Sequence, residues 1–198
     1  YPSMLPTYNQ KGYDLCRAFL PKYGFGFSKP FTHAQNLPTG SIFKIVTAYE
    51  GLRTCQDRDP SILNPLTLID QIHTFSKGGR QIPALGKWMD GGSIPRYYKG
   101  GRLPKSYKSL GPLNLTGALA KSSNLYFSIL AGDYIPSFSH LLDSAHLFGF
   151  GTKTGIELTN EQRGFLPKDL RGNKTGLYAF SIGQHTLLST PLQTACCF

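Results

Sequence analysis

The sequence predicts one globular domain, or part of one, with an α/β or α+β fold. Its 198 residues are 40% hydrophobic, which is enough to bury one sizeable core. The 22 glycines and 14 prolines exceed what a helical bundle carries, and their spread along the chain indicates many turns. One broad apolar helical face, from Ser41 to about Arg53, adds a helix to this turn-rich background.

The first half of the chain combines turns, this one helix and a poorly periodic stretch. Residues 1–37 hold turn-forming and aromatic residues, with 23–27 as a candidate edge strand. A Pro-Thr-Gly turn precedes Ser41, so we expect the helix to begin there. Residues 54–111 show poor periodicity and three glycine pairs, and we expect a long, partly irregular connection.

The second half predicts a series of short helices. Helical spacing favours 113–121 and 124–130, which meet at a Ser-Ser pair, and 138–148. Another helix is expected to start at Thr190-Pro191, because proline is tolerated in a first turn.

Charge and cysteine content exclude few partners. The net charge of +10 suits a polyanion or an anionic membrane surface, but solvated surface is the simpler interpretation. The basic stretch from Lys77 to Lys108 carries no recognised nucleic-acid motif. The four cysteines lack the spacing of a metal site, so we expect no metal and no cofactor. No stretch is long and apolar enough to span a bilayer.

A candidate nucleophile lies at the start of the predicted helix. Ser41 and Lys44 form the only Ser-x-x-Lys in the chain. Positions i and i+3 share a helix face, so the lysine amine can reach the hydroxyl. A serine needs an adjacent base, and lysine serves as one only when burial or nearby positive charge lowers its pKa. On pattern alone, a helix cap followed by a solvated lysine explains the same residues.

A second candidate element is the only Ser-x-Asn, at Ser122-Ser123-Asn124. A serine and an amide at a helix junction can face the nucleophile, relay its proton and bind the amide of a peptide substrate. Ordinary helix capping is the alternative, and it suffices for this motif taken alone.

Together these motifs belong to a longer resemblance. Four blocks of the chain resemble, in the same order, segments of penicillin-binding protein transpeptidase domains: Pro38 to Ala48, Leu119 to Phe127, Phe148 to Pro167, and Ser181 to Ala195. The residues from Ile42 to Ala48 and the opening Tyr1-Pro2-Ser3 are more similar to the monofunctional class B enzymes than to the bifunctional class A enzymes.

The resemblance implies a peptidoglycan D,D-transpeptidase that also binds β-lactams. The implied catalytic residues are Ser41, Lys44, Ser122 and Asn124, and the implied substrate-binding residues are Ser123 and Gly40. Ser41 would attack D-alanyl-D-alanine of a stem peptide, and an amine of a neighbouring strand would resolve the acyl-enzyme. The backbone amide of Ser41 would form half of an oxyanion hole.

The implied fold is an antiparallel sheet of five strands with helices, plus an all-helical subdomain, of which residues 1–198 hold mainly the latter. Two Lys-Thr-Gly triplets, at 153–155 and 174–176, have the residues of the third family motif but not its sequence context. We expect the true motif to lie past Phe198, together with the C-terminal strands. We therefore expect this chain alone to be inactive and poorly stable. Residues 78–108 are expected to be an inserted loop.

The implied setting is bacterial cell-wall synthesis. The domain would lie on the outer face of the cytoplasmic membrane, with its anchor outside this chain, beside other cell-wall synthesis proteins. The elongation and division roles stay open. Alternatives are a D,D-carboxypeptidase and a β-lactam-sensing or scaffold domain that acylates without turnover. Ser122-Ser123-Asn124 argues against a class D-type β-lactamase.

Overall fold

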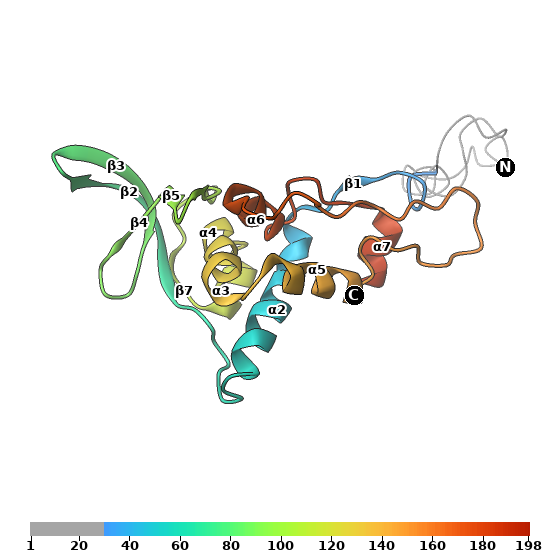
Figure 1. Cartoon of the computed structure of the whole chain (residues 1–198), viewed down its shortest axis with the longest axis horizontal. Coiled ribbons are helices and arrows are strands. Elements are labelled where there is room, and N and C mark those ends of the chain that lie inside the picture. The colour runs from blue at the N-terminus through green and yellow to red at the C-terminus, as the bar shows by residue number, and fades with distance from the viewer. Residues whose placement is uncertain (1–29) are drawn as a thin grey trace, which may run out of the picture.

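The computed structural model describes residues 30–198, in which helices pack beside a small antiparallel sheet (Figure 1). The expected α+β class is confirmed. The helical elements are η2 (Gly40–Phe43), α2 (Lys44–Gln56), α3 (Leu115–Ala120), α4 (Asn124–Ile129), the π-helical turn η3 (Leu130–Tyr134), α5 (Phe138–Leu147), α6 (Lys174–Phe180) and α7 (Pro191–Cys196). The strands are β1 (Leu37–Pro38), β2 (Leu68–Lys77), β3 (Arg80–Lys87), β4 (Ser93–Pro95), β5 (Tyr97–Tyr98), β6 (Gly101–Arg102), β7 (Gly111–Leu113) and β8 (Leu188–Ser189).

Helices α2, α3, α4, α5 and α7 agree with the expectations from the sequence, whereas α6 was not expected. The helix expected from Ser41 is present, although its first turn is the 3-10 helix η2. The helices expected at 113–121, 124–130 and 138–148 appear as α3, α4 and α5, and α7 begins at Pro191 behind a capping box. The candidate edge strand at 23–27 lies outside the described residues.

The main sheet corrects one expectation. Residues 54–111 were expected to form a long, partly irregular connection, but they hold β2 to β6. Together with β7, which begins at Gly111, three of these strands form a four-stranded antiparallel sheet in the order β4-β3-β2-β7. The β2–β3 hairpin turns at Gly78 and Gly79, both with positive φ, as a two-residue hairpin turn requires. Its outer half projects from the body of the molecule (Figure 1). Whether 78–108 is an insertion stays a prediction, and its residues include β3 to β6 rather than a loop alone.

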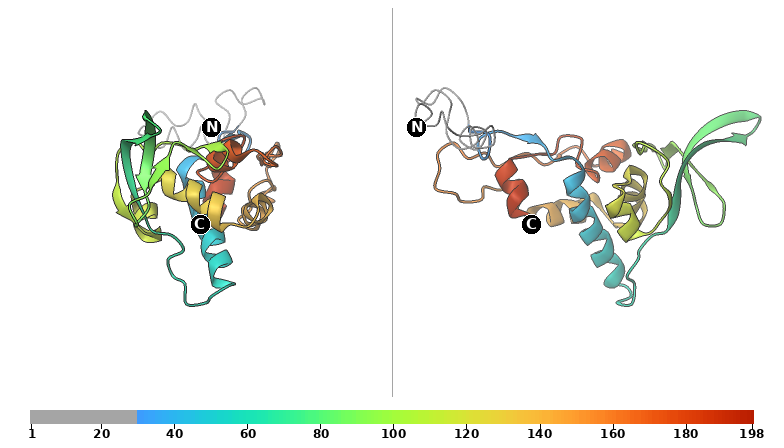
Figure 2. Two further views of the ribbon diagram at one scale, coloured as in Figure 1. Left: turned by 60° about the vertical axis from the view of Figure 1, so that its left-hand side comes forward. Right: turned by 180° about the vertical axis from the view of Figure 1, so that it is seen from behind.

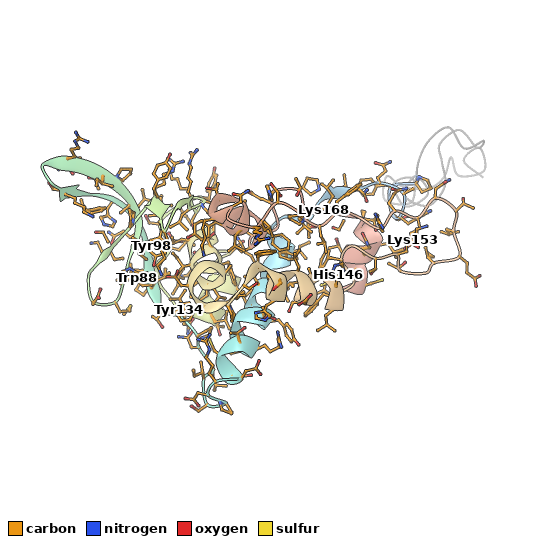
Figure 3. The ribbon with its side chains drawn as sticks, viewed as in Figure 1. Trp88, Tyr98, Tyr134, His146, Lys153 and Lys168 are labelled. Carbon is orange, nitrogen blue, oxygen red and sulfur yellow. The ribbon has the colours of Figure 1, made fainter. Side chains whose placement is uncertain are left out.

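Helix α2 occupies the middle of the molecule, with the main sheet towards one end and α7 and β1 towards the other (Figure 2). It packs against α3, α4, η3 and α5. One buried cluster lies between the sheet and the helices and includes Leu68, Leu85 and Leu125. Trp88, Tyr98 and Tyr134 border this cluster at the sheet end of the molecule (Figure 3).

A second buried cluster joins α2, α5 and α6. At its centre the ring of Phe43 lies 5.5 Å from that of Phe150 and 4.8 Å from that of Phe180. Because Phe43 comes directly before Lys44, this packing fixes the start of α2 in the core.

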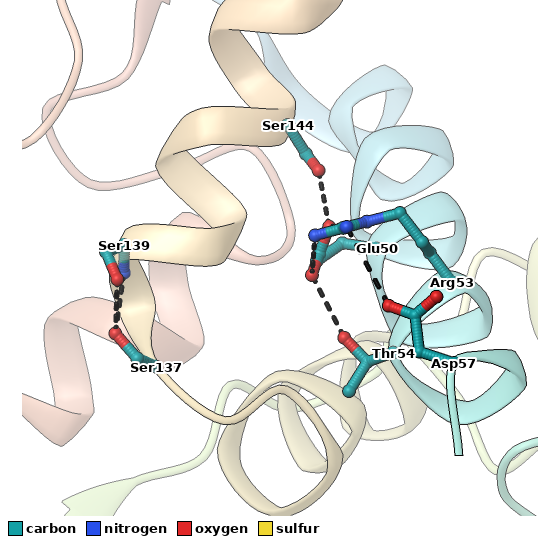
Figure 4. Close-up of polar contacts among 7 residues, drawn as sticks. All are labelled: Glu50, Arg53, Thr54, Asp57, Ser137, Ser139 and Ser144. Carbon is teal, nitrogen blue, oxygen red and sulfur yellow. Dashed lines mark hydrogen bonds and ion pairs between the residues drawn. The ribbon is translucent and has the colours of Figure 1, made fainter.

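A buried carboxylate also ties α2 to α5. Glu50 is fully buried and accepts hydrogen bonds from Ser144 at 2.6 Å and Thr54 at 2.9 Å (Figure 4). Arg53 pairs with it at 3.0 Å while staying 42% exposed. The charge of Glu50 is therefore satisfied by hydrogen bonds on both helices.

Candidate active site

Ser41 and Lys44 lie where a turn passes into a helix. Gly40 has φ +64, a conformation that favours glycine, and η2 then carries Ser41. In a 3-10 helix, side chains at i and i+3 eclipse each other. The Lys44 amine thus lies 3.2 Å from the hydroxyl of Ser41. Ser41 is exposed, whereas Lys44 is only 2% exposed.

The turn between α3 and α4, together with the first residue of α4, supplies three further partners of the Lys44 amine. Its Nζ donates to the carbonyl oxygen of Ser122 at 2.7 Å, and it lies 2.8 Å from the Ser122 hydroxyl. It also donates to Asn124 Oδ1 at 2.7 Å. The structure therefore brings together all four residues predicted to be catalytic.

The amide of Asn124 has a defined orientation. Its Nδ2 donates to the carbonyl oxygen of Lys105 at 2.9 Å, so Oδ1 is the atom that faces Lys44. Ser122 has φ +54, which is uncommon for a residue with a side chain. This strained backbone directs the Ser122 carbonyl at the amine, and such strain is typical of functional sites.

Ser123 was expected to bind substrate, and that role stays a prediction. Its side chain is fully buried, donates to Asp70 Oδ2 at 2.7 Å and accepts from the backbone amide of Tyr126 at 3.1 Å. The residue caps α4, whose first turn needs such an acceptor. A substrate cannot contact this hydroxyl in the described arrangement.

Sequence reasoning missed Asp70, which lies on β2 and is 1% exposed. Its Oδ2 also accepts from the Ser106 hydroxyl at 2.6 Å. The available signal was an aspartate two residues after Leu68, on the buried face of a strand. Without a predicted strand in this region, that alternation carried no meaning.

Burial sets the charge state of the site. Desolvation lowers the pKa of Lys44 to about 8, and the nearby Asp70 opposes this shift. Burial raises the pKa of Asp70, against the hydrogen bonds from Ser106 and Ser123 and the charge of Lys44. At neutral pH, a pKa near 8 leaves about a tenth of the Lys44 amine unprotonated.

Gly40 contacts the turn that follows α6. Its backbone amide donates to the carbonyl oxygen of Gly183 at 2.8 Å. That amide is already paired, and a substrate-binding role for Gly40 stays a prediction.

Neither Lys-Thr-Gly triplet lies in a strand. Residues 174–176 form the first turn of α6. At 153–155, the backbone amide and hydroxyl of Thr154 each donate to Glu161 at 2.6 Å. Lys153 lies towards the end of the molecule that carries α7 (Figure 3).

In residues 30–198, no group of three or more His, Cys, Asp or Glu side chains is arranged to hold a metal ion. Within the same residues, no helix has the length and apolarity to cross a membrane.

Comparison with known families decides where this arrangement belongs. A model of the penicillin-binding protein transpeptidase domain matches residues 73–198, more than half of the chain. The chain belongs to this family. The match includes Ser122 and Asn124 but begins after Ser41 and Lys44, so the geometry described above connects those two residues to the family region.

Individual penicillin-binding proteins give the same result. The peptidoglycan D,D-transpeptidase FtsI of Buchnera aphidicola is 42% identical over 83 residues, which are 42% of this chain and 14% of that protein. The chain therefore spans about one seventh of this curated relative.

Solved structures of penicillin-binding proteins share the fold. A complex between PBP2 and MreC from Helicobacter pylori matches with a TM-score of 0.57 and 22% identity, over 84% of this chain and 27% of that one. An imipenem acyl-enzyme complex of penicillin-binding protein A from Mycobacterium tuberculosis matches with a TM-score of 0.54 and 18% identity, over 84% and 32%.

Proposed function

We propose that this chain carries the catalytic centre of a peptidoglycan D,D-transpeptidase, with Ser41 as the acylated nucleophile. Family membership and the likeness to FtsI, itself named a peptidoglycan D,D-transpeptidase, support the reaction class. The arrangement around Lys44 supports the assignment of roles.

The observation that carries the proposal is the hydrogen-bond set of the Lys44 amine. Two of its partners, the Ser122 carbonyl and Asn124 Oδ1, are obligate acceptors at 2.7 Å each. A neutral amine has two N–H groups, and these two acceptors use both. The nitrogen lone pair is then left to face the hydroxyls of Ser41 and Ser122. The amine is thus oriented to accept a proton from Ser41, directly or through Ser122.

The proposed reaction runs in two steps, acylation of Ser41 and aminolysis of the resulting ester. The Ser41 oxygen attacks the carbonyl carbon between the two D-alanines, and its proton passes to Lys44. The C–N bond breaks, the terminal D-alanine leaves, and its amine takes up the proton. The amine of a second stem peptide then attacks the ester carbonyl and forms an amide C–N bond, the C–O bond to Ser41 breaks, and the proton lost by the amine passes through Lys44 to the Ser41 oxygen.

β-Lactams present a similar carbonyl to the same serine. The imipenem acyl-enzyme complex of the M. tuberculosis relative supports extending this reaction to the present chain. A covalent β-lactam adduct at Ser41 is accordingly the simplest experimental signature of the proposal.

The proposed setting follows the same relatives. We expect a domain held at the outer face of the cytoplasmic membrane, with its anchor outside this chain. The complex of H. pylori PBP2 with MreC supports a place among cell-wall synthesis proteins. The D,D-carboxypeptidase differs only in using water to resolve the ester, and a β-lactam sensor differs in not resolving it.

The test is labelling of the full-length protein with a fluorescent penicillin, followed by intact-mass analysis. Wild type should gain one penicillin mass, and Ser41→Ala should gain none while keeping its fold by circular dichroism. Turnover of a pentapeptide donor with an amine acceptor then separates the transpeptidase from the carboxypeptidase and the sensor. A folded wild type that does not label refutes the proposal.

A further inference from the structure

Asp70 is a buried carboxylate that the proposed reaction does not use. It is 1% exposed and belongs to β2, outside the sequence motifs that carry Ser41 and Asn124. Its Oδ2 accepts two hydroxyl groups at once, from Ser106 at 2.6 Å and from Ser123 at 2.7 Å. Burying a charge costs free energy unless the charge is hydrogen-bonded, and the two hydroxyl groups supply these bonds.

The carboxylate fixes the direction of both hydroxyl groups. Each hydroxyl has one proton, and donating it to Asp70 leaves only acceptor capacity. Ser106 Oγ then accepts from the backbone amide of Asn124 at 3.1 Å. Ser123 Oγ accepts from the backbone amide of Tyr126 at 3.1 Å. Asp70 therefore holds the first turn of α4 through two oriented hydroxyl groups.

Asn124 is consequently held from two sides by residues 105–106. Its backbone amide meets Ser106, and its side-chain Nδ2 meets the Lys105 carbonyl at 2.9 Å. Since Asp70 ties Ser106 in place, it fixes this segment as well as the α4 cap. The remaining atom of the amide, Oδ1, lies 2.7 Å from the Lys44 amine.

We propose that Asp70 is a positioning residue, which sets the Asn124 amide against Lys44 so that the amine faces Ser41. This inference rests on the proposed acyl transfer at Ser41. Asp70 contacts neither the substrate nor the nucleophile, yet it controls the rate and the pH dependence of acylation.

Electrostatics supports the geometric argument. Asp70 raises the pKa of Lys44, against the larger effect of burial. Among the charged side chains on the neighbouring segments, Lys105, Lys108 and Lys121 are exposed, and Lys87, which lies on the paired strand β3, is half-buried. Lys121 donates to the carbonyl oxygen of Leu110 at 3.0 Å. Removing the Asp70 charge should therefore lower the pKa of Lys44 and move the acylation profile to lower pH.

Two substitutions separate the position of Asp70 from its charge. Asp70→Asn keeps an acceptor for the two hydroxyls and removes the charge, whereas Asp70→Ala removes both. In the full-length protein, we expect acylation by fluorescent penicillin to slow by up to about 100-fold in Asp70→Ala, because small misplacements of reacting groups cost that much. Asp70→Asn should slow less, and its pH midpoint should lie below that of wild type. Asp70→Glu should not restore the wild-type rate, because its longer side chain displaces both hydroxyls.

Glu50→Gln is the matched control. Glu50 is also buried and also accepts two hydroxyl groups, from Ser144 and Thr54, but it contacts none of the four proposed catalytic residues. This variant should unfold at lower denaturant concentration, with the wild-type acylation rate and pH midpoint below its unfolding transition. A purely structural role for Asp70 predicts the same behaviour for Asp70→Asn, and that result overturns the inference.

A second readout separates this inference from the proposed function. The pKa of Lys44 is followed by NMR of 13Cε-labelled lysine, with the resonance assigned by Lys44→Ala. If wild type fails to label with penicillin, the proposed function fails, and the NMR titration still decides the role of Asp70. A lower Lys44 pKa in Asp70→Asn supports it, and an unchanged pKa refutes it.

Discussion

The backbone amide of Gly40 donates to the carbonyl oxygen of Gly183 at 2.8 Å, which joins the turn before the nucleophile to the turn after α6. The contact leaves no room for a side chain at Gly183. A Cβ there would lie 1.7 Å from the Gly40 carbonyl oxygen, and φ at Gly183 is +78. The position of Ser41 thus depends on a residue more than 140 positions further along the chain.

Gly183→Ala should accordingly disrupt the site. We expect a loss of folding free energy well above the roughly 1 kcal/mol of a left-handed alanine, and acylation slowed with it. Gly172→Ala is the control, because Gly172 has φ +71 with open space around its Cβ position. Urea unfolding and penicillin labelling check both variants, and equal effects would contradict the close-approach argument.

Acylation should follow the titration of Lys44. Below pH 8 the amine is mostly cationic and has no lone pair for the Ser41 proton, so the rate should rise through about pH 8 and level off above it. Lys44→Arg should abolish acylation at every pH, because guanidinium does not deprotonate. A labelling rate independent of pH from 6 to 9 would rule out Lys44 as the base.

The same shift predicts a slope in stability. The folded-state pKa of Lys44 is about 8 against an ordinary 10.5, so the unfolded chain binds more protons between these values. The contribution of Lys44 therefore makes the folded state more stable as pH rises through that window. Urea unfolding of wild type and Lys44→Met at pH 8 and pH 10 measures this slope, which should be absent in the variant.

The α2–α5 contact should depend on Glu50. Glu50→Ala removes the acceptor of Ser144 and Thr54 and should cost about 3 kcal/mol of folding free energy. Arg53→Ala should cost at most about 1 kcal/mol, because its side chain is 42% exposed and the ion pair is screened. Equal losses in the two variants would show that the ion pair, and not the hydroxyl bonds, stabilises this contact.

The outer half of the β2–β3 hairpin should be dispensable for acylation. Replacing residues 76–81 by Asn-Gly joins the paired Phe75 and Ile82, which both have a backbone N–H, through a two-residue turn. The hairpin base stays intact, where Gly86 lies against Leu125 of α4. Labelling should be unchanged, and a lost label in a folded variant would give the projecting hairpin a role in the site.

The sequence allowed α2, α3, α4, α5, α7 and the Ser41–Lys44 pair to be predicted, because these depend on local spacing, whereas α6 was not predicted. It did not allow the sheet to be predicted. Beyond Asp70, β2 is exposed or half-buried on both faces, so it lacks the alternation that marks a half-buried strand. Asp70 was missed for the same reason, and the burial of the Ser123 side chain was not foreseen because a motif does not tell which side chains point inwards.

The partners of the Lys44 amine come from residues 78 and 80 positions further along the chain. In an unfolded or partly synthesised chain, Lys44 has neither these acceptors nor the burial that lowers its pKa. Ser41 then has no base beside it, and the reactive centre exists only once the tertiary structure has formed. Covalent labelling therefore also detects the native chains in a mixed population. Before folding, Ser41 is a weak nucleophile, so the nascent chain is not modified at this residue.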